Sequence, residues 1–174
     1  MIGERAASDT SVVPDPAFLA AIAYDIPNEV SFAGEPVPLD IADVRERLDK
    51  ELQINCYLHS NTLFLLKRAN RWLPQMQKIL DRYEIPQDFK YLPLIESNLI
   101  NVRSPRDAVG YWQILADSGR ELGLEITPEV DERYDPLKST EAACKYLNKA
   151  YSKFENWTLA AASYNRGVSG LSVR

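Results

Sequence analysis

Residues 89–97 read Phe-Lys-Tyr-Leu-Pro-Leu-Ile-Glu-Ser, an apolar stretch with a single carboxyl group, that of Glu96. On a helix, Leu92, Glu96 and Leu99 lie at positions i, i+4 and i+7 and share one face. We expect Ile95 on that face, and we expect the face to meet the core. A carboxyl group taken out of water keeps its proton more readily, and a protonated one near neutral pH can act as a general acid. Taken alone, the pattern is more typical of a Glu at the edge of an amphipathic stripe with its carboxyl group in water, because Glu is rarely buried without a partner.

The composition of the chain is that of a folded globular domain. It has 174 residues, 45% of them hydrophobic and 26% charged, which is enough for one domain with an extension. A net charge of -5 leaves no basic footprint for nucleic acid and no polybasic patch for anionic lipid. No apolar run is long enough to span a bilayer, and the first residues lack the apolar core of a secretion signal. The protein is therefore either cytoplasmic or follows an export signal outside this chain.

Cysteine and histidine are too sparse to predict a metal or redox centre. Cys56 and Cys144 are the only cysteines, and their spacing matches no metal or redox motif. We favour two separate buried thiols, with a disulfide in an oxidising compartment as the alternative. His59 is the only histidine, which argues against a histidine metal site and against a Ser-His-Asp triad unless His59 is the base. No cofactor and no metal are expected.

Three regions are predicted along the chain. Residues 1–38 contain five of the eleven prolines, which fix φ and remove backbone donors. We interpret this region as an extended leader or strap, and a disordered tail is an equal alternative. Residues 39–83 carry helical stripes and should pack on the third region, residues 84–174, which contains Glu96.

Apolar residues recur at helical spacing in the first half of the chain, and no segment alternates convincingly as a strand would. A helix should begin near Asp40, which can cap it, and another should begin at Ser60. Pro74 marks a kink or a restart within that second pattern. A further helix, starting after Pro86, should carry Glu96.

The second half of the chain continues the helical pattern. Residues 108–122 are predicted to form a helix that ends at Gly123, a favourable residue just past a helix C-terminus. Ser139 should cap the next helix. The last helix should begin at Trp157 and stop near Gly167. We therefore predict an all-α domain with an irregular, proline-rich N-terminal extension.

Three short segments contain residue types that carry chemistry. They are Glu96-Ser97, residues 110–114 (Gly-Tyr-Trp-Gln-Ile) and residues 162–165 (Ala-Ser-Tyr-Asn). Each segment has an ordinary structural explanation when taken singly. The glycine could relieve a helix start, the glutamine could be solvated, and the tyrosine could be a core aromatic residue.

Taken in order, these segments resemble the soluble lytic transglycosylase (SLT) domain, with its lysozyme-like helical fold, in particular the membrane-bound lytic murein transglycosylase D type. The resemblance covers residues 60–174 and includes residues 89–97 with the Glu-Ser pair. Residues 104–114 match as Ser-Pro-x-x-Ala-x-Gly-x-Trp-Gln-Ile. Residues 131–136 (Asp-Glu-Arg-Tyr-Asp-Pro) and 157–165 (Trp-Thr-Leu-Ala-Ala-Ala-Ser-Tyr-Asn) match as well. Residues 84–174 would then be the catalytic domain.

The resemblance implies cleavage of the MurNAc-GlcNAc β-1,4 bond of peptidoglycan, with Glu96 as the single catalytic acid and base. Glu96 would protonate the glycosidic oxygen and then accept the proton of the muramyl C6 hydroxyl. That hydroxyl attacks C1 and leaves a 1,6-anhydro ring, so no second carboxylate is required, unlike the two-carboxylate scheme of other glycosidases. The partner would be a peptidoglycan glycan strand in the periplasm or at the outer membrane. Membrane association would come only through a lipid anchor outside this chain.

Supporting roles also follow from the resemblance. Gln113 should line the glycan groove, Tyr164 should approach Glu96 or the scissile sugar, and Asn165 should hold the local backbone. Ser97 and Ser104 should donate hydrogen bonds near Glu96. Tyr111 and Trp112 could offer an apolar face to a sugar, and core packing is an equal alternative for Trp112.

The chain also departs from the family pattern. Asp107 stands where the family usually has Gly, a replacement that a positive φ tolerates. Residues 115–118 (Leu-Ala-Asp-Ser) replace Met-Pro-x-Thr at the groove floor. Relatives continue with further helices, so we expect part of one groove wall to be missing from a chain that ends at Arg174.

Two other functions remain open at this stage. One is a lysozyme-type hydrolase on the same fold, which would use Glu96 as acid and water as nucleophile. The other is a glycan-binding module without catalysis.

Overall fold

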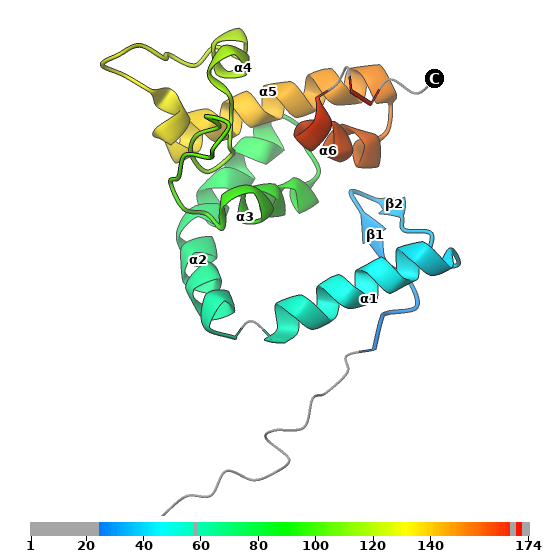
Figure 1. The fold of residues 1–174 in the computed structure, drawn as a ribbon. Helices are drawn as coiled ribbons and strands as arrows, with labels where there is room; N and C mark the ends of the chain where they lie inside the picture. Colours follow the sequence, from blue (N-terminus) through cyan, green and yellow to red (C-terminus); the bar gives the residue numbers. More distant parts are fainter. Residues whose placement is uncertain (1–24, 58, 168–169, 172–174) are drawn as a thin grey trace, which may run out of the picture.

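The computed structural model describes residues 25–57, 59–167 and 170–171, and within them the fold is predominantly helical, as predicted (Figure 1). In chain order the elements are β1 (Ser31–Phe32), β2 (Glu35–Pro36), α1 (Ala42–Tyr57), α2 (His59–Arg82), the 3-10 helix η2 (Gln87–Tyr91), α3 (Leu92–Ser97), α4 (Ala116–Glu121), the 3-10 helix η3 (Glu132–Tyr134), α5 (Pro136–Phe154) and α6 (Trp157–Arg166). β1 and β2 form a small antiparallel hairpin that pairs Ser31 with Pro36 and Phe32 with Glu35. None of the described helices is long and apolar enough to span a membrane.

The core lies where α5 packs against α2 on one side and against α6 on the other. Its largest fully buried side chains come from α2, η2, α5 and the loop before α4: Met76, Leu80, Phe89, Trp112 and Leu147. Full burial of one such side chain stabilises the fold by roughly 1.5–3 kcal/mol. These contacts hold together the elements on which the predicted site residues stand.

The two cysteines are separate thiols, as favoured from the sequence. Cys144 is buried in α5, and burial raises the pKa of its thiol to about 12. Cys56 in α1 is only half-buried, so the expectation that both thiols are buried holds for Cys144 alone.

The helix α2 contributes to the core only with its second half. Its core-facing residues begin at Ala69, whereas Leu63 and Leu66 are 55% and 56% exposed. The first turns of α2 therefore lie outside the core. Pro74 lies inside α2, so the predicted restart there is wrong; Pro74 is exposed, and the carbonyl that it leaves without an amide partner can meet water. The predicted region boundaries at residues 38 and 83 stay predictions.

The predicted helix over residues 108–122 is wrong for its first half. Only α4 is helical, and the residues before it form a loop with bridges between Arg103 and Val109 and between Val109 and Ile114. The reason is backbone geometry: Gly110 and Gln113 have φ of 81° and 49°. A right-handed helix cannot pass through residues in the left-handed region.

The last two helices are capped at their N-termini by side chains. α5 begins at Pro136, and Asp135 accepts hydrogen bonds from the backbone N–H groups of Leu137 and Lys138, so the predicted cap at Ser139 is wrong. Proline at the first helical position pre-sets φ and needs no donor there, which explains the earlier start. α6 begins at Trp157 and ends before Gly167, as predicted.

Residues 25–38, called the strap from here on, are packed against the helical domain. The hairpin of the strap lies near α6 and α1 in Figure 1. The backbone N–H of Ala33 donates to the Asp88 carboxylate at 2.7 Å, and the Phe32 ring lies 5.2 Å from the Phe89 ring, centroid to centroid. This part of the predicted leader is therefore a strap, and residues 1–24 lie outside the described residues.

Candidate functional site

Glu96 lies in the last turn of α3 and is half-buried. Burial raises the pKa of its carboxyl group above the ordinary value, and no neighbouring charge contributes to the shift. Among the described residues, no group makes a hydrogen bond or ion pair with this carboxyl group. Glu96 is thus partly removed from water without a partner, which is the arrangement that favours a protonated acid.

The prediction that Ile95 lies on the core-facing side of α3 is wrong. Ile95 is 79% exposed, whereas Pro93, Ser97 and Leu99 are buried. Pro93 and Ser97 are one turn apart and share the buried face, and Ile95 lies about 200° around the helix from each. Glu96 therefore stands at the border between the buried face and the exposed one.

Ser97 connects α3 to the loop that precedes α4. Its buried hydroxyl group lies 2.8 Å from the carbonyl oxygen of Tyr111 and 3.0 Å from that of Pro93. These contacts fix the C-terminal end of α3 against residues 110–112. Helix α3 ends here because Asn98 and Leu99 both adopt positive φ, 52° and 53°.

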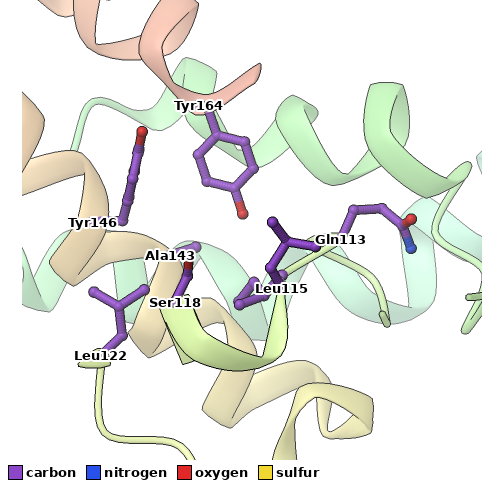
Figure 2. A pocket seen from close by; sticks show the side chains of 8 residues that line it. Gln113, Leu115, Ser118, Leu122, Ala143, Tyr146 and Tyr164 are labelled. Atoms are coloured by element: carbon purple, nitrogen blue, oxygen red, sulfur yellow. The ribbon is translucent and has the colours of Figure 1, made fainter. Parts of the chain in front are cut away.

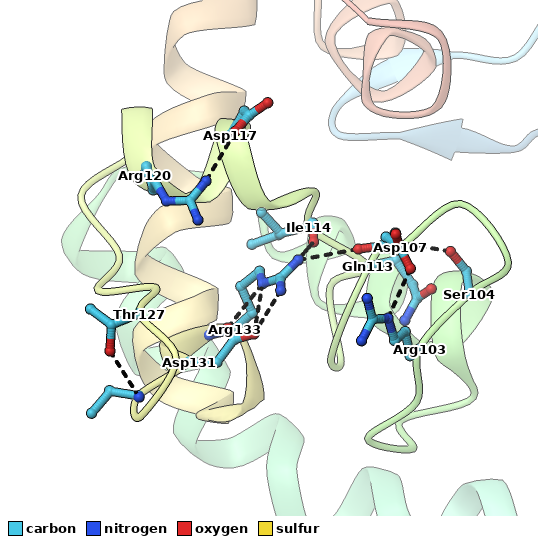
Figure 3. Close-up of polar contacts among 12 residues, drawn as sticks. Arg103, Ser104, Asp107, Gln113, Ile114, Asp117, Arg120, Thr127, Asp131 and Arg133 are labelled. Atoms are coloured by element: carbon cyan, nitrogen blue, oxygen red, sulfur yellow. Dashed lines mark hydrogen bonds and ion pairs between the residues drawn. The ribbon is translucent and has the colours of Figure 1, made fainter.

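A buried arginine organises the loop over residues 101–115 (Figure 3). The Arg133 guanidinium donates from Nη1 to the carbonyl oxygens of Asp107 (3.2 Å) and Ile114 (3.1 Å). Its Nε and Nη2 donate to the Asp131 carboxylate, at 2.9 Å and 2.6 Å. Hydrogen bonds from Arg133 lower the pKa of Asp131, so this pair stays charged. The sequence match at residues 131–136 assigned no role to Arg133 or Asp131, so sequence reasoning missed this pair.

Two residues of the loop have backbone conformations that restrict their identity. Gly110 has φ of 81°, and a Cβ atom there would lie 2.0 Å from the carbonyl oxygen of Arg133. Only glycine fits this approach. Asp107 has φ of 63°, as the proposed replacement of a family glycine requires, and its carboxylate pairs with Arg103 at 2.8 Å.

Gln113 and Ser104 use their side chains to hold the same loop. The Gln113 amide Nε2 donates to the carbonyl oxygens of Gly110 (2.8 Å) and Val102 (3.1 Å). The Gln113 side chain extends away from Tyr164 in Figure 2. The Ser104 hydroxyl accepts from the backbone N–H of Ala108 at 3.1 Å. Neither residue contacts Glu96.

Tyr164 approaches Glu96 from α6. Its hydroxyl donates to the carbonyl oxygen of Trp112 at 2.7 Å. Burial raises the pKa of the Tyr164 hydroxyl well above its usual range, and the nearby Glu96 charge raises it further. Trp112 is fully buried and donates from Nε1 to the Thr140 hydroxyl at 2.8 Å, so the core-packing alternative holds for Trp112.

A pocket of about 100 Å³ opens beside Tyr164 (Figure 2). Its walls come from the loop, α4, α5 and α6, with Gln113, Leu115, Ser118, Tyr146 and Tyr164 among its lining residues. Tyr146 was not expected from the sequence: its ring packs edge-on to Tyr164 at 5.3 Å. Leu115 and Ser118 belong to the segment that departs from the family pattern, so this departure does shape the pocket wall.

The structure brings part of the predicted set together. Glu96 and Tyr164 are neighbours, and Ser97 and Tyr111 are linked directly behind Glu96. Tyr111 is only 9% exposed and packs edge-on to the Trp72 ring at 5.5 Å. Asn165 is exposed and makes no side-chain hydrogen bond with another described residue. The substrate-binding roles of all these residues stay predictions.

The fold and site define a helical domain with a half-buried carboxyl group whose charge raises the pKa of a nearby tyrosine, beside a loop held by hydrogen bonds. Residues 75–172 match the family model of the transglycosylase SLT domain, and the chain belongs to this family. The resemblance read from the sequence is thereby confirmed.

Relatives agree with this membership. Over 142 residues the chain is 31% identical to the membrane-bound lytic murein transglycosylase D of Escherichia coli (strain K12), and equally to that of Escherichia coli O6:H1 (strain CFT073). Each alignment covers 79% of this chain and 30% of the relative, so the chain spans less than a third of their length. A protein of Alteromonas sp. (strain M-1), named for resistance to tributyltin chloride, is 28% identical over 113 residues, covering 64% of this chain and 55% of that protein.

Proposed function

We propose that this chain is a lytic transglycosylase domain that cleaves the MurNAc-GlcNAc β-1,4 bond of peptidoglycan and leaves a 1,6-anhydro-MurNAc end. The observation that carries the proposal is the state of Glu96, which is half-buried, without a partner and raised in pKa by burial alone. One carboxyl group suffices for this reaction, because the C6 hydroxyl of the substrate takes the place of the nucleophilic carboxylate of retaining glycosidases.

The reaction needs two proton transfers at Glu96. The protonated carboxyl group donates its proton to the glycosidic oxygen as the bond from that oxygen to C1 breaks. The resulting carboxylate accepts the proton of the muramyl C6 hydroxyl, whose oxygen bonds to C1. The proton returns to Glu96, and no water is consumed. A raised pKa suits a group that must both give and recover a proton near neutral pH.

The other predicted residues act around this centre. Tyr164 stays neutral, and its hydroxyl orients the Trp112 carbonyl beside the scissile sugar. Ser97 holds the end of α3 in place through Tyr111, so it positions Glu96. Gln113, Ser104, Tyr111 and Asn165 border the path of the glycan strand. Action on peptidoglycan places the domain in the periplasm or at the outer membrane.

The test is mass spectrometry of the fragments released from purified peptidoglycan sacculi. We expect muramyl ends that are one water lighter than reducing ends. Ordinary reducing ends would instead identify a lysozyme-type hydrolase, and binding to sacculi without any release would identify a glycan-binding module. Glu96→Gln serves as the inactive control.

A further inference from the structure

An apolar hollow lies between the strap and the helical domain. It has a volume of about 470 Å³, and its lining includes Phe32 of the strap, Tyr91 at the end of η2, Ile95 of α3 and Ala161 of α6. Ile95 and Tyr91 are 79% and 47% exposed, although both are large and apolar. Apolar side chains gathered in an open hollow mark a surface that a ligand can cover.

This hollow is built on the two helices, α3 and α6, that carry Glu96 and Tyr164. Ile95 directly precedes Glu96 on α3, and Ala161 precedes Tyr164 by three residues on the same face of α6. The pocket of Figure 2 is lined by Tyr164 itself. The residue before Glu96 thus lines one hollow, and Tyr164, whose pKa the Glu96 charge raises, lines the other. An enzyme that cuts a polymer must hold the chain on both sides of the scissile bond.

The strap is fixed firmly enough to act as a wall. The Glu35 carboxylate accepts hydrogen bonds from the backbone N–H groups of Trp157 (2.6 Å) and Thr158 (2.9 Å), the first residues of α6. A carboxylate is favoured at a helix N-terminus, where backbone donors are unpaired and the dipole is positive. Contacts with Thr158 lower the pKa of Glu35, so the anchor is charged at neutral pH. The Trp157 ring packs edge-on to Phe89 at 5.4 Å, which joins this anchor to Phe32.

We propose that the strap, α3 and α6 form a subsite for an N-acetylhexosamine ring of the glycan strand adjacent to the scissile bond. The apolar C–H face and the acetyl methyl group of the sugar would pack on Tyr91, Ile95 and Phe32. Ser31 and Asp88 line the same hollow and supply polar groups for sugar hydroxyls. The strap lies outside residues 75–172, so this subsite adds to the SLT domain a wall that the matched segment does not contain. The inference rests on the proposed function for the identity of its ligand.

The test measures glycan binding without cleavage. The probe is a tetrasaccharide of alternating GlcNAc and MurNAc, titrated by calorimetry into the chain that carries Glu96→Gln. Adding Tyr91→Ala or Ile95→Ser should raise Kd by about tenfold, the loss expected when a large contact residue is truncated. Both side chains are well exposed, so neither change should affect folding. Val130→Ser is the matched control: Val130 is 40% exposed on a loop outside the hollow, and its Kd should equal that of the parent.

A second variant tests the strap itself. Glu35→Ala removes the anchor at α6 and should weaken binding as much as Tyr91→Ala does. Unchanged Kd values for both Tyr91→Ala and Ile95→Ser would overturn the subsite. Failure of the proposed function looks different: the unmodified chain would then release no anhydro ends from sacculi, while the titration would still decide whether the hollow binds glycan.

Discussion

The loop over residues 101–115 and the short helix α3 lie side by side, yet they treat their polar side chains in opposite ways. In the loop, the Gln113 and Ser104 side chains hydrogen-bond to backbone atoms, and Nη1 of Arg133 in η3 donates to two loop carbonyl groups. In α3, Glu96 has no partner among the described residues, and its neighbour Ile95 faces solvent. The comparison teaches that the polar groups of the loop have hydrogen-bond partners in the protein, whereas the Glu96 carboxyl group has none among the described residues.

The largest expected effect is on activity and comes from replacing Glu96 in α3. Glu96→Gln should lower the rate of release from sacculi by about 10²–10⁴-fold, because positioned acid–base catalysis contributes that much. The side chain makes no contact that the fold needs, so the thermal unfolding of the variant should remain cooperative. Release at the unmodified rate would show that Glu96 is not the acid.

For the hydrogen-bonded loop, Arg133→Met should lower the free energy of unfolding by about 3 kcal/mol. The change leaves Asp131 without its counter-charge and the Asp107 carbonyl group without its Arg133 donor, whereas the Ile114 carbonyl keeps the backbone N–H of Val109. Breaking a buried charged pair of this kind is costly. The Arg133 side chain is 8% exposed. Urea denaturation measures the loss.

Arg120→Met is the control for that variant. Arg120 pairs with Asp117, but their side chains are 53% and 95% exposed. Pairs in water contribute about 0–1 kcal/mol, so this change should be nearly neutral. Equal losses in the two variants would contradict the role given to Arg133.

A smaller loss is expected at the tight approach between the loop and Arg133. Gly110→Ala should lower the free energy of unfolding by about 2–3 kcal/mol, because alanine disfavours a positive φ and its Cβ would be forced against a backbone carbonyl. Gly34→Ala is the matched control, because Gly34 has φ of 79° but no atom within 4 Å of a Cβ. Gly34→Ala should lower the free energy of unfolding by about 1 kcal/mol, because only the positive φ is unfavourable there. Urea denaturation of both variants separates the two causes.

Tyr164→Phe should lower the free energy of unfolding by about 1–2 kcal/mol, because the Trp112 carbonyl loses its donor. Tyr151→Phe, on an exposed part of α5, is the control and should be neutral. Sacculus digestion by the same variant tests the site. A fall in rate with substrate affinity retained would support action beside Glu96, and an unchanged rate would restrict Tyr164 to a structural role.

The smallest effect concerns pH. Burial raises the pKa of Glu96 in the folded state, so its protonated form is favoured there. The unmodified chain should therefore lose stability relative to Glu96→Gln as pH rises through that raised pKa, and the two should converge below the ordinary pKa of Glu. Thermal melts of both proteins across this range measure the difference. Glu35, whose pKa is lowered, contributes equally to both proteins and cancels.

Sequence patterns identified the helical fold, the last helix and the family, and they singled out Glu96, which the structure shows to be half-buried. They failed where backbone conformation or packing overrides local preference. The helix predicted from Ala108 is interrupted by left-handed residues, and only Gly110 among them has an identity that signals it. The orientation of Ile95 depends on which side of α3 the loop covers, and that choice is made by the contact between Ser97 and Tyr111.

By itself, the order of residues determined that this protein is a helical SLT domain with one candidate acid, because apolar periodicity and motif spacing are properties of the chain alone. Only the tertiary structure decided that Glu96 lacks a hydrogen-bond partner among the described residues, that Arg133 holds the loop and that the strap is anchored to α6. Desolvation and long-range hydrogen bonds arise between segments far apart in the chain. The Glu35 carboxylate, for example, meets the amide of Trp157 across 122 residues.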